Sequence, residues 1–418
     1  MSFYSLPGWG GGAIGETQSE SVLIKGFALA MPSIHLSFLV ITGFPLYPKS
    51  FTGLLKKNAG LFFLAFYGFF TALWSPLPGH SLQRVFSFFI IVSSICSLVL
   101  LYTHFNKRNA WRVLLDHIQI SFFLAHCIIL YLAMSQPDIA FRYTQSRLGG
   151  ILIHPNTLGA FCMISILINL FRLMCEKKKL LLSLVSLVLA MIVLIMSFSR
   201  SSIILTIFSV QLLVYLHLKS LDISRKAKIL KNLAVGLAGL ALLLVLSNKA
   251  YYIATLLSRG DSMENLMTAS SRTLLWKIIL DKLDYYLLIG HGYATLSGKG
   301  IVVVLGYFKT LHAHNGYVQL LAGTGLIGLS LFLYQLFLYL KFTLSLKTTS
   351  DRKYSILLFS LLIAFLLHNV IQSSIGYQIY PQFVFPVLLI NLLWHYEYFP
   401  ENPLSTKDIR KERKKYKP

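Results

Sequence analysis

Residues 180–218, LLLSLVSLVLAMIVLIMSFSRSSIILTIFSVQLLVYLHL, contain two apolar runs separated by the short polar segment SFSRSS at 197–202. A helix needs about 20 apolar residues to cross a bilayer. The stretch therefore predicts two spans, 180–198 and 202–218, joined by a tight turn that carries Arg200. Because exposing a charge to lipid is costly, an arginine at this depth usually faces a cavity or a partner. The alternative is a side chain that extends to the phosphate headgroups.

The composition extends this interpretation to the whole chain. Of its 418 residues, 56% are hydrophobic and 13% are charged, whereas soluble domains average roughly 45–50% and about 25%. We therefore predict an all-α membrane protein, a polytopic bundle of 11 or 12 transmembrane helices. The number is open because Lys25, Pro32 and His35 interrupt the first span, 22–47, so 11–47 could instead hold two short helices. The other predicted spans are 58–76, 85–104, 112–133, 151–171, 180–198, 202–218, 232–253, 316–340, 354–372 and 378–396.

Basic residues predict the orientation of these spans. They cluster in every second loop and in the tail, and such clusters mark the cytoplasmic side of a membrane. The net charge of +23 therefore reflects topology, and we expect no nucleic-acid partner. The chain divides into N-terminal transmembrane helices (1–253), a loop domain on the far side (254–315), C-terminal transmembrane helices (316–396) and a basic cytoplasmic tail (397–418).

The middle of the large loop, SSRTLLWKIILDKLDYYLL at 270–288, predicts a short amphipathic helix. Ser270 or Ser271 would be its N-cap, since serine oxygens accept the first free backbone N–H groups of a helix. We expect this helix to lie on the membrane surface. One face carries the apolar residues Leu275, Ile278, Ile279 and Leu283.

Two more arginines on the far side are candidates for binding an anion. Arg147 precedes Gly149, Gly150 and Pro155, and irregular backbone at this depth implies a cavity lining. Arg272 falls in the first turn of the predicted loop helix. A guanidinium at a helix N-terminus is a natural diphosphate site. Arg84, Arg142 and Arg259 have no such context, and we interpret them as ordinary surface cations.

Histidines on the same side are candidates for proton transfer. His312 and His314 lie where a span begins. They could form a metal pair, but no cluster of Asp, Glu or Cys accompanies them, so we expect neither a metal nor a cofactor. His314 is then either a general base or, with Asn315, part of a helix N-cap. Since the spans hold no pair of carboxylates, a proton- or sodium-coupled carrier is disfavoured.

Several segments in this order resemble the O-antigen ligase and polymerase superfamily of envelope glycan enzymes. They are ALWSPLPGHSLQR (72–84), SRLGGILIHPNTLG (146–159), SFSRSS (197–202), SSRTLLW and GHG (290–292). The family's ligase motif, His-[Asn/Ser/Gln]-x9-Gly-x-x-[Gly/Thr/Tyr], is matched by His314, Asn315, Gly325 and Gly328. Its second ligase signature, Arg-x3-Leu, is not matched, because the fourth residue after each candidate arginine is Ile151, Ile204 or Trp276.

The resemblance implies transfer of a glycan from undecaprenyl diphosphate to a sugar hydroxyl, on the periplasmic side of a bacterial inner membrane. For a ligase the acceptor is lipid A–core. Arg147, Arg200 and Arg272 would bind the diphosphate and His314 would be the base. Asn315, His312, His154 and Asn156 would support them. An O-antigen polymerase and a protein O-oligosaccharyltransferase, which share this chemistry, remain alternatives, as does a transporter of lipid-linked glycans.

Overall fold

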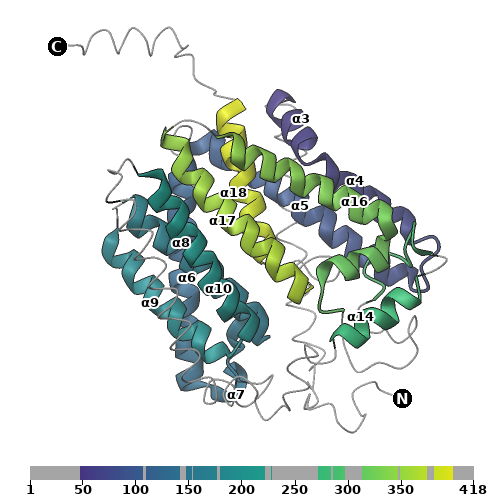
Figure 1. Ribbon diagram of the computed structural model, residues 1–418, viewed down its shortest axis with the longest axis horizontal. Coiled ribbons are helices and arrows are strands. Elements are labelled where there is room, and N and C mark those ends of the chain that lie inside the picture. Colours follow the sequence, from purple (N-terminus) through teal and green to yellow (C-terminus); the bar gives the residue numbers. More distant parts are fainter. Residues whose placement is uncertain are drawn as a thin grey trace.

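Long α-helices build the protein in this computed structural model (Figure 1). The structure describes residues 48–398 except for 107–109, 142–146, 153, 177–178, 222–226, 228–271, 284–285, 297–312, 347–348 and 374–380. Within these residues, seven helices are long and apolar enough to cross a membrane. The protein is therefore an all-α, multi-pass membrane protein. The seven are α5 (Pro78–Asn106), α6 (Ala110–Ser135), α8 (Pro155–Cys175), α9 (Leu180–Ser197), α10 (Arg200–Ser220), α16 (Gly316–Ser345) and α17 (Thr349–Ile371).

The predicted spans can be compared with these helices one by one. Spans 22–47 and 232–253 lie outside the described residues, as does the tail 399–418. Each other span coincides with a helix, two of which have shorter apolar stretches, α4 (Ala59–Thr71) and α18 (Pro381–Tyr398). A helix that was not predicted, α3 (Pro48–Lys57), precedes α4. The two helices are separated at Asn58, whose backbone is not helical (φ −106°, ψ 19°).

Two groups of helices lie on either side of α17 and α18 (Figure 1). One group contains α6, α8, α9 and α10, and the other contains α4, α5 and α16. Helix α17 contacts α8, α10 and α16 as well as α18. Helix α17 therefore contacts both groups.

Buried amide side chains join helices that are distant in sequence. Asn58 donates to Asn391 of α18 at 2.7 Å, and Asn391 donates back at 3.0 Å. Tyr339 of α16 donates to the same Asn58 oxygen. Gln119 of α6 donates to Asn169 of α8 at 2.9 Å. Such bonds satisfy polar groups that lipid could not, so they hold the helices in register.

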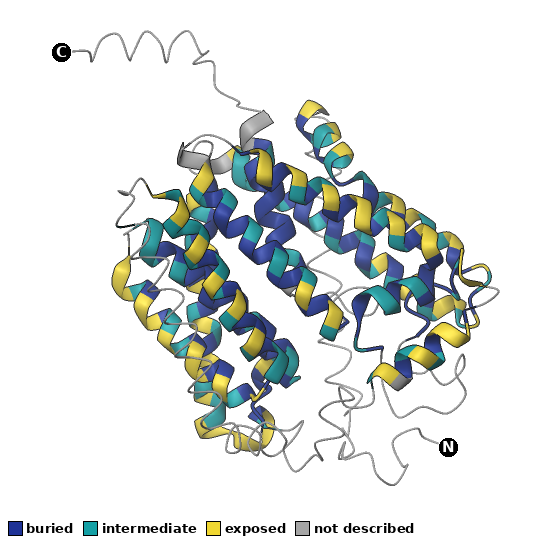
Figure 2. Ribbon diagram, in the orientation of Figure 1, coloured by how far each residue is buried: buried dark blue, intermediate teal, exposed yellow. Residues whose placement is uncertain are grey.

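The outer faces of the helices are apolar. On α9, Leu181 is 75% exposed and Ile195 is 62% exposed, and Phe66 on α4 is 62% exposed. Figure 2 shows exposed residues along the outer sides of these helices and buried ones between them. A surface of this kind suits contact with lipid.

The two ends of the bundle differ in charge chemistry. At one end, where α8 finishes, Arg172 pairs with Asp116 and Glu176, and Lys179 pairs with Asp116 at 2.8 Å. We refer to the opposite end, where α8, α10 and α16 begin, as the site end. Which end faces the cytoplasm stays a prediction from the basic residues.

The predicted loop helix is present as α14 (Arg272–Asp281), although its N-cap lies outside the described residues. Its predicted apolar face packs on α16: Leu275, Ile279 and Leu283 are each at most 2% exposed and cluster with Ala322 and Val318. This part of the apolar face is therefore covered by protein, and the position of the helix at the membrane surface stays a prediction. Helical periodicity predicted that the face is buried, but not that another helix covers it.

Candidate active site

Four helices begin at the site end with a residue that the sequence singled out. His154 caps α8, and its Nδ1 accepts from the backbone N–H of Asn156 at 3.1 Å. Arg200 is the first residue of α10 and Arg272 is the first residue of α14. Asn315 caps α16 by accepting from the N–H groups of Tyr317 and Val318. Since a helix N-terminus carries a partial positive charge, this arrangement favours an anion.

The structure brings the predicted arginines and histidines close enough to act on one another. The pKa of His314 is lowered to about 4, first by burial and then by the charges of Arg272 and His154. The pKa of His154 is lowered to about 4 by burial and by Arg147. Burial, followed by the charge of Arg200, lowers the pKa of Arg272. We call these five residues the arginine–histidine cluster; His312 lies outside the described residues.

Arg147 is buried, and protein acceptors fix its guanidinium. Its Nε donates to the Ser197 carbonyl at 3.1 Å, and its Nη2 donates to Asn156 Oδ1 at 2.7 Å. The N–H of Leu148 donates to the Met196 carbonyl at 3.0 Å. Arg147 therefore ties the start of α8 to the end of α9, next to the turn that carries Arg200. Asn156, expected to be supporting, orients Arg147 directly.

His314 has a left-handed backbone, with φ +51°, which is uncommon for a residue with a side chain. Its neighbours are fixed on both sides. The carbonyl of Ala313 accepts from Trp276 Nε1 at 2.7 Å, and the N–H of Ala313 donates to Gln319 Oε1 at 2.9 Å. Asn315 caps α16, so the predicted N-cap role belongs to Asn315, and His314 lies just before it.

The glycines of the same motif have a different role. At Gly325 the helix α16 is broken, with φ 63° and ψ −167°. The turn 287–292 packs against this break: the N–H of His291 donates to the Ala322 carbonyl, and the N–H of Leu326 donates to the Leu287 carbonyl, both at 2.9 Å. A Cβ at position 325 would lie 2.2 Å from the carbonyl oxygen of Leu288.

The Trp-Ser-Pro segment supports the same turn. Trp74 Nε1 donates to the carbonyl of Gly290 at 2.9 Å. The hydroxyls of Ser75 and Ser81 are 2.8 Å apart, and that of Ser75 is 3.3 Å from the hydroxyl of Thr295. The segments at 72–84 and 290–292 therefore pack on one another.

A comparison with known families matches residues 185–333 to the family described as O-antigen ligase. This domain match supports membership of the O-antigen ligase and polymerase superfamily. The match includes Arg200, Arg272 and His314, and it ends after the motif glycines Gly325 and Gly328. No curated protein matches the chain. Membership indicates a glycosyltransferase that acts on lipid-linked glycans in a membrane.

Beyond the matched region, the structure brings further residues to the site that the sequence reasoning missed. They come from the end of α17. Arg272 Nη1 donates to the Ile371 carbonyl at 2.8 Å, and His368 lies within electrostatic reach of Arg272. Gln372, the residue after Ile371, is 2% exposed and acts to raise the pKa of His314. The signal was the polar run HNVIQSS at 368–374, which follows an apolar stretch. It resembles the ordinary end of a span.

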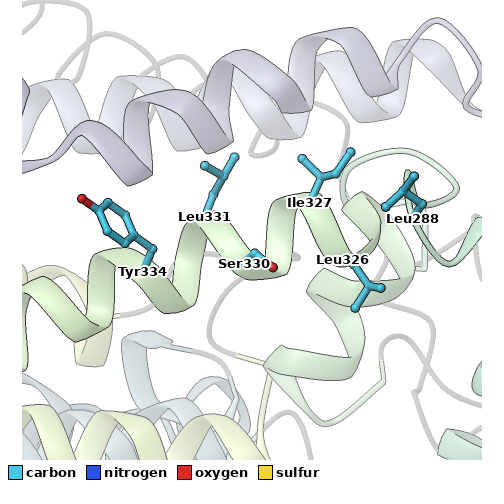
Figure 3. Close-up of a pocket in the computed structure, with 6 residues that line it drawn as sticks. All are labelled: Leu288, Leu326, Ile327, Ser330, Leu331 and Tyr334. Carbon is cyan, nitrogen blue, oxygen red and sulfur yellow. The ribbon is translucent and has the colours of Figure 1, made fainter.

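A groove on α16 is lined mainly by apolar side chains, unlike the arginine–histidine cluster. It has a volume of about 450 Å³ and is lined by Leu288, Leu326, Ile327, Ser330, Leu331 and Tyr334 (Figure 3). Leu288 is 59% exposed and Tyr334 is 55% exposed, so the groove is part of the lipid-facing surface.

Among the described residues, no group of three His, Cys, Asp or Glu side chains could hold a metal ion.

Proposed function

We propose that this protein is an O-antigen ligase. It moves O-antigen glycan from undecaprenyl diphosphate to lipid A–core, with inversion and without a metal ion, on the periplasmic side of the bacterial inner membrane. The observation that carries the proposal is the arginine–histidine cluster, which gathers at the starts of four helices the residues expected of such a site.

The charge of the cluster matches the donor. A diphosphate diester carries two negative charges, and it meets Arg200 and Arg272 at the positive ends of α10 and α14. A guanidinium has five N–H donors, so the bond from Arg272 to Ile371 orients its planar fork while leaving donors for phosphate oxygens. Arg147, which donates hydrogen bonds to Ser197 and Asn156, adds a further positive charge to the cluster. Cationic groups of this kind would repel a divalent metal ion, which supports metal-independent chemistry.

The proposed reaction is a single displacement at the anomeric carbon. The acceptor hydroxyl forms the new C–O bond and gives its proton to the imidazole of His314. The bond from the anomeric carbon to the phosphate oxygen breaks, and its electron pair leaves on undecaprenyl diphosphate. Negative charge therefore grows on the diphosphate, and preorganised guanidinium groups stabilise it most at that moment. Attack from the opposite face inverts the anomeric centre.

The protonation state of His314 suits this role. With a pKa of about 4 it is neutral at neutral pH, so it can accept a proton. A bound diphosphate would offset the charge of Arg272, one of the groups that lower this pKa. Donor binding would then make His314 more basic. The base would be strongest when both substrates are in place.

A polymerase of the same superfamily is the second candidate, because Ile151, Ile204 and Trp276 stand where the ligase signature has leucine. A deletion strain separates the two functions. Loss of a ligase leaves lipid-linked polymer and a bare lipopolysaccharide core, whereas loss of a polymerase leaves cores capped by one repeat. Single-repeat caps would refute the ligase assignment.

A further inference from the structure

Trp276 of α14 makes a hydrogen bond to the residue directly before His314. Its indole Nε1 donates to the Ala313 carbonyl at 2.7 Å. Trp276 is the fourth residue after Arg272, where the superfamily's ligase signature has leucine. A leucine side chain has no group that could donate a hydrogen bond. The departure from the signature therefore adds a contact between α14 and the segment that carries the proposed base.

Helix α14 connects this contact with the proposed diphosphate site. Arg272 and Trp276 are four residues apart, so they share one face of the helix and lie about 6 Å apart along its axis. Arg272 Nη1 donates to the Ile371 carbonyl at 2.8 Å. The buried residues Leu275 and Ile279 pack against α16. Because several contacts hold this short helix, the position of Trp276 is fixed relative to Arg272.

Both backbone groups of Ala313 are bonded to side chains. Its carbonyl accepts from Trp276, and its N–H donates to Gln319 Oε1 at 2.9 Å. Gln319 is fully buried, and its Nε2 donates to the Leu296 carbonyl at 2.6 Å, which fixes the amide in one orientation. Gln319 belongs to α16, whereas Trp276 belongs to α14. Ala313 therefore joins the two helices through its two backbone groups.

These bonds constrain the backbone of His314. Its φ of +51° lies in the left-handed region, which a residue with a side chain adopts where its surroundings impose it. On the other side of His314, Asn315 caps α16. The strain at such a residue is comparable to the worth of one or two hydrogen bonds. Loss of the bond from Trp276 would therefore let the backbone of His314 relax and displace its imidazole.

We propose that Trp276 is a positioning residue for the transfer reaction, a role that rests on the proposed function of His314 as the base. Through the Ala313 carbonyl, Trp276 holds the backbone of His314 in its left-handed conformation. The same bond ties the base to the helix that begins with Arg272, so that the base and the diphosphate are aligned with one another. Trp276 acts through His314 and not on the substrates themselves.

The test compares Trp276→Phe with a matched control, Trp74→Phe. Both changes keep an aromatic ring and remove an indole N–H that donates to a backbone carbonyl, at 2.7 Å for Trp276 and at 2.9 Å for Trp74. The acceptor of Trp74 is Gly290, in the turn 287–292. The full chain is purified in lipid nanodiscs. The donor is lipid-linked polymer extracted from the deletion strain, and the acceptor is lipid A–core from the same strain.

Trp276→Phe should lower kcat by about 100-fold, as expected when a catalytic group is displaced by about 1 Å, and should leave the Kd of the donor unchanged. Trp74→Phe should lower the Tm by a similar amount, because it loses an equivalent bond, but should keep the wild-type kcat. A merely structural role of Trp276 would lower the Tm and leave kcat unchanged. Wild-type kcat in folded Trp276→Phe, or equal losses of kcat in the two variants, would overturn the proposal.

A closer isostere of tryptophan covers the case in which Trp276→Phe does not fold. Trp276→benzothienylalanine, introduced by nonsense suppression, keeps the shape of the bicyclic ring and replaces the N–H by a sulfur atom that cannot donate. It should show the same loss of kcat, whereas the same replacement at Trp74 should not. Wild-type kcat with the isostere at Trp276 would refute the positioning role.

A double-mutant cycle shows whether Trp276 acts through His314. His314→Ala should retain about 10⁻² to 10⁻⁴ of the rate, which long incubations can measure. Adding Trp276→Phe should then cost nothing further, because the group that it positions is absent. A further loss of about 100-fold would reveal a different role and overturn the proposal. If His314→Ala retains full transfer, the proposed base itself is wrong. If His314→Ala is nearly inactive while Trp276→Phe keeps the wild-type kcat, only the role of Trp276 fails.

Discussion

Substituting Gly325 by alanine tests which part of the ligase motif is structural. The backbone of Gly325 (φ 63°, ψ −167°) lies in a region that is essentially restricted to glycine, where a side chain costs about 1–3 kcal/mol. The new Cβ would also lie 2.2 Å from the backbone oxygen of Leu288. The turn 287–292 would have to move, and with it the hydrogen bonds to Leu326 and Ile327 at 2.9 and 3.3 Å. Each is worth about 0.5–1.5 kcal/mol.

Together these terms predict a destabilisation of about 2–6 kcal/mol. Gly79→Ala is the matched control, because a Cβ at Gly79 meets nothing within 4 Å. Both variants and the wild type are heated in the same detergent, and the folded fraction is followed by size-exclusion chromatography with fluorescence detection. The Tm of Gly325→Ala should fall by about 2–7 °C, while that of Gly79→Ala should not change. Equal melting of all three proteins would refute the assignment of Gly325 as a structural break.

The remaining predictions concern the reaction and the topology. His314→Ala should insert stably and bind donor, but transfer about 10²- to 10⁴-fold more slowly, with His312→Ala much milder; near-normal transfer per folded molecule would exclude His314 as the base. Alanine at Arg147, Arg200 or Arg272 should abolish activity, and lysine should rescue poorly because it lacks the planar fork; normal activity in all three alanine variants would place the diphosphate elsewhere. Transfer by purified protein should survive EDTA, and a loss that a divalent ion restores would show metal dependence. In intact spheroplasts an impermeant maleimide should label a single cysteine at 299 but not at 410, and the reverse result would invert the topology.

The sequence was informative wherever a property is local. Apolar length alone predicted α5, α6, α8, α9, α10, α16 and α17, because a spanning helix satisfies its own backbone hydrogen bonds. Helical periodicity likewise predicted α14, which begins at Arg272. Arg147 and Arg200 were identified because they stand at the ends of apolar runs, where a charged side chain is costly in lipid and usually functional.

Properties that depend on tertiary contacts could not be predicted in this way. The apolar face of α14 packs on α16 because of how the turn 287–292 closes against Gly325, a contact between segments more than 30 residues apart. Gln372 joins the site only because α17 ends beside α14 and α16. In the sequence it is an ordinary polar residue after a span. The left-handed backbone of His314 is likewise imposed by Trp276 and Gln319, which hold Ala313.

The amide pair between Asn58 and Asn391 has a consequence for the order of assembly. The two residues are 333 positions apart, and ribosomes add about 5–20 residues per second. The N-terminal partner must therefore wait roughly 17–70 s in the membrane before the C-terminal partner has been synthesised. During that time the carboxamide of Asn58 can bond to the Leu54 carbonyl of the preceding helix, α3, and to Tyr339 once α16 has entered. The polar contact is therefore complete only after α18 has been inserted. A nascent chain that stops before α18 leaves this contact incomplete, and quality-control proteases can recognise such a chain.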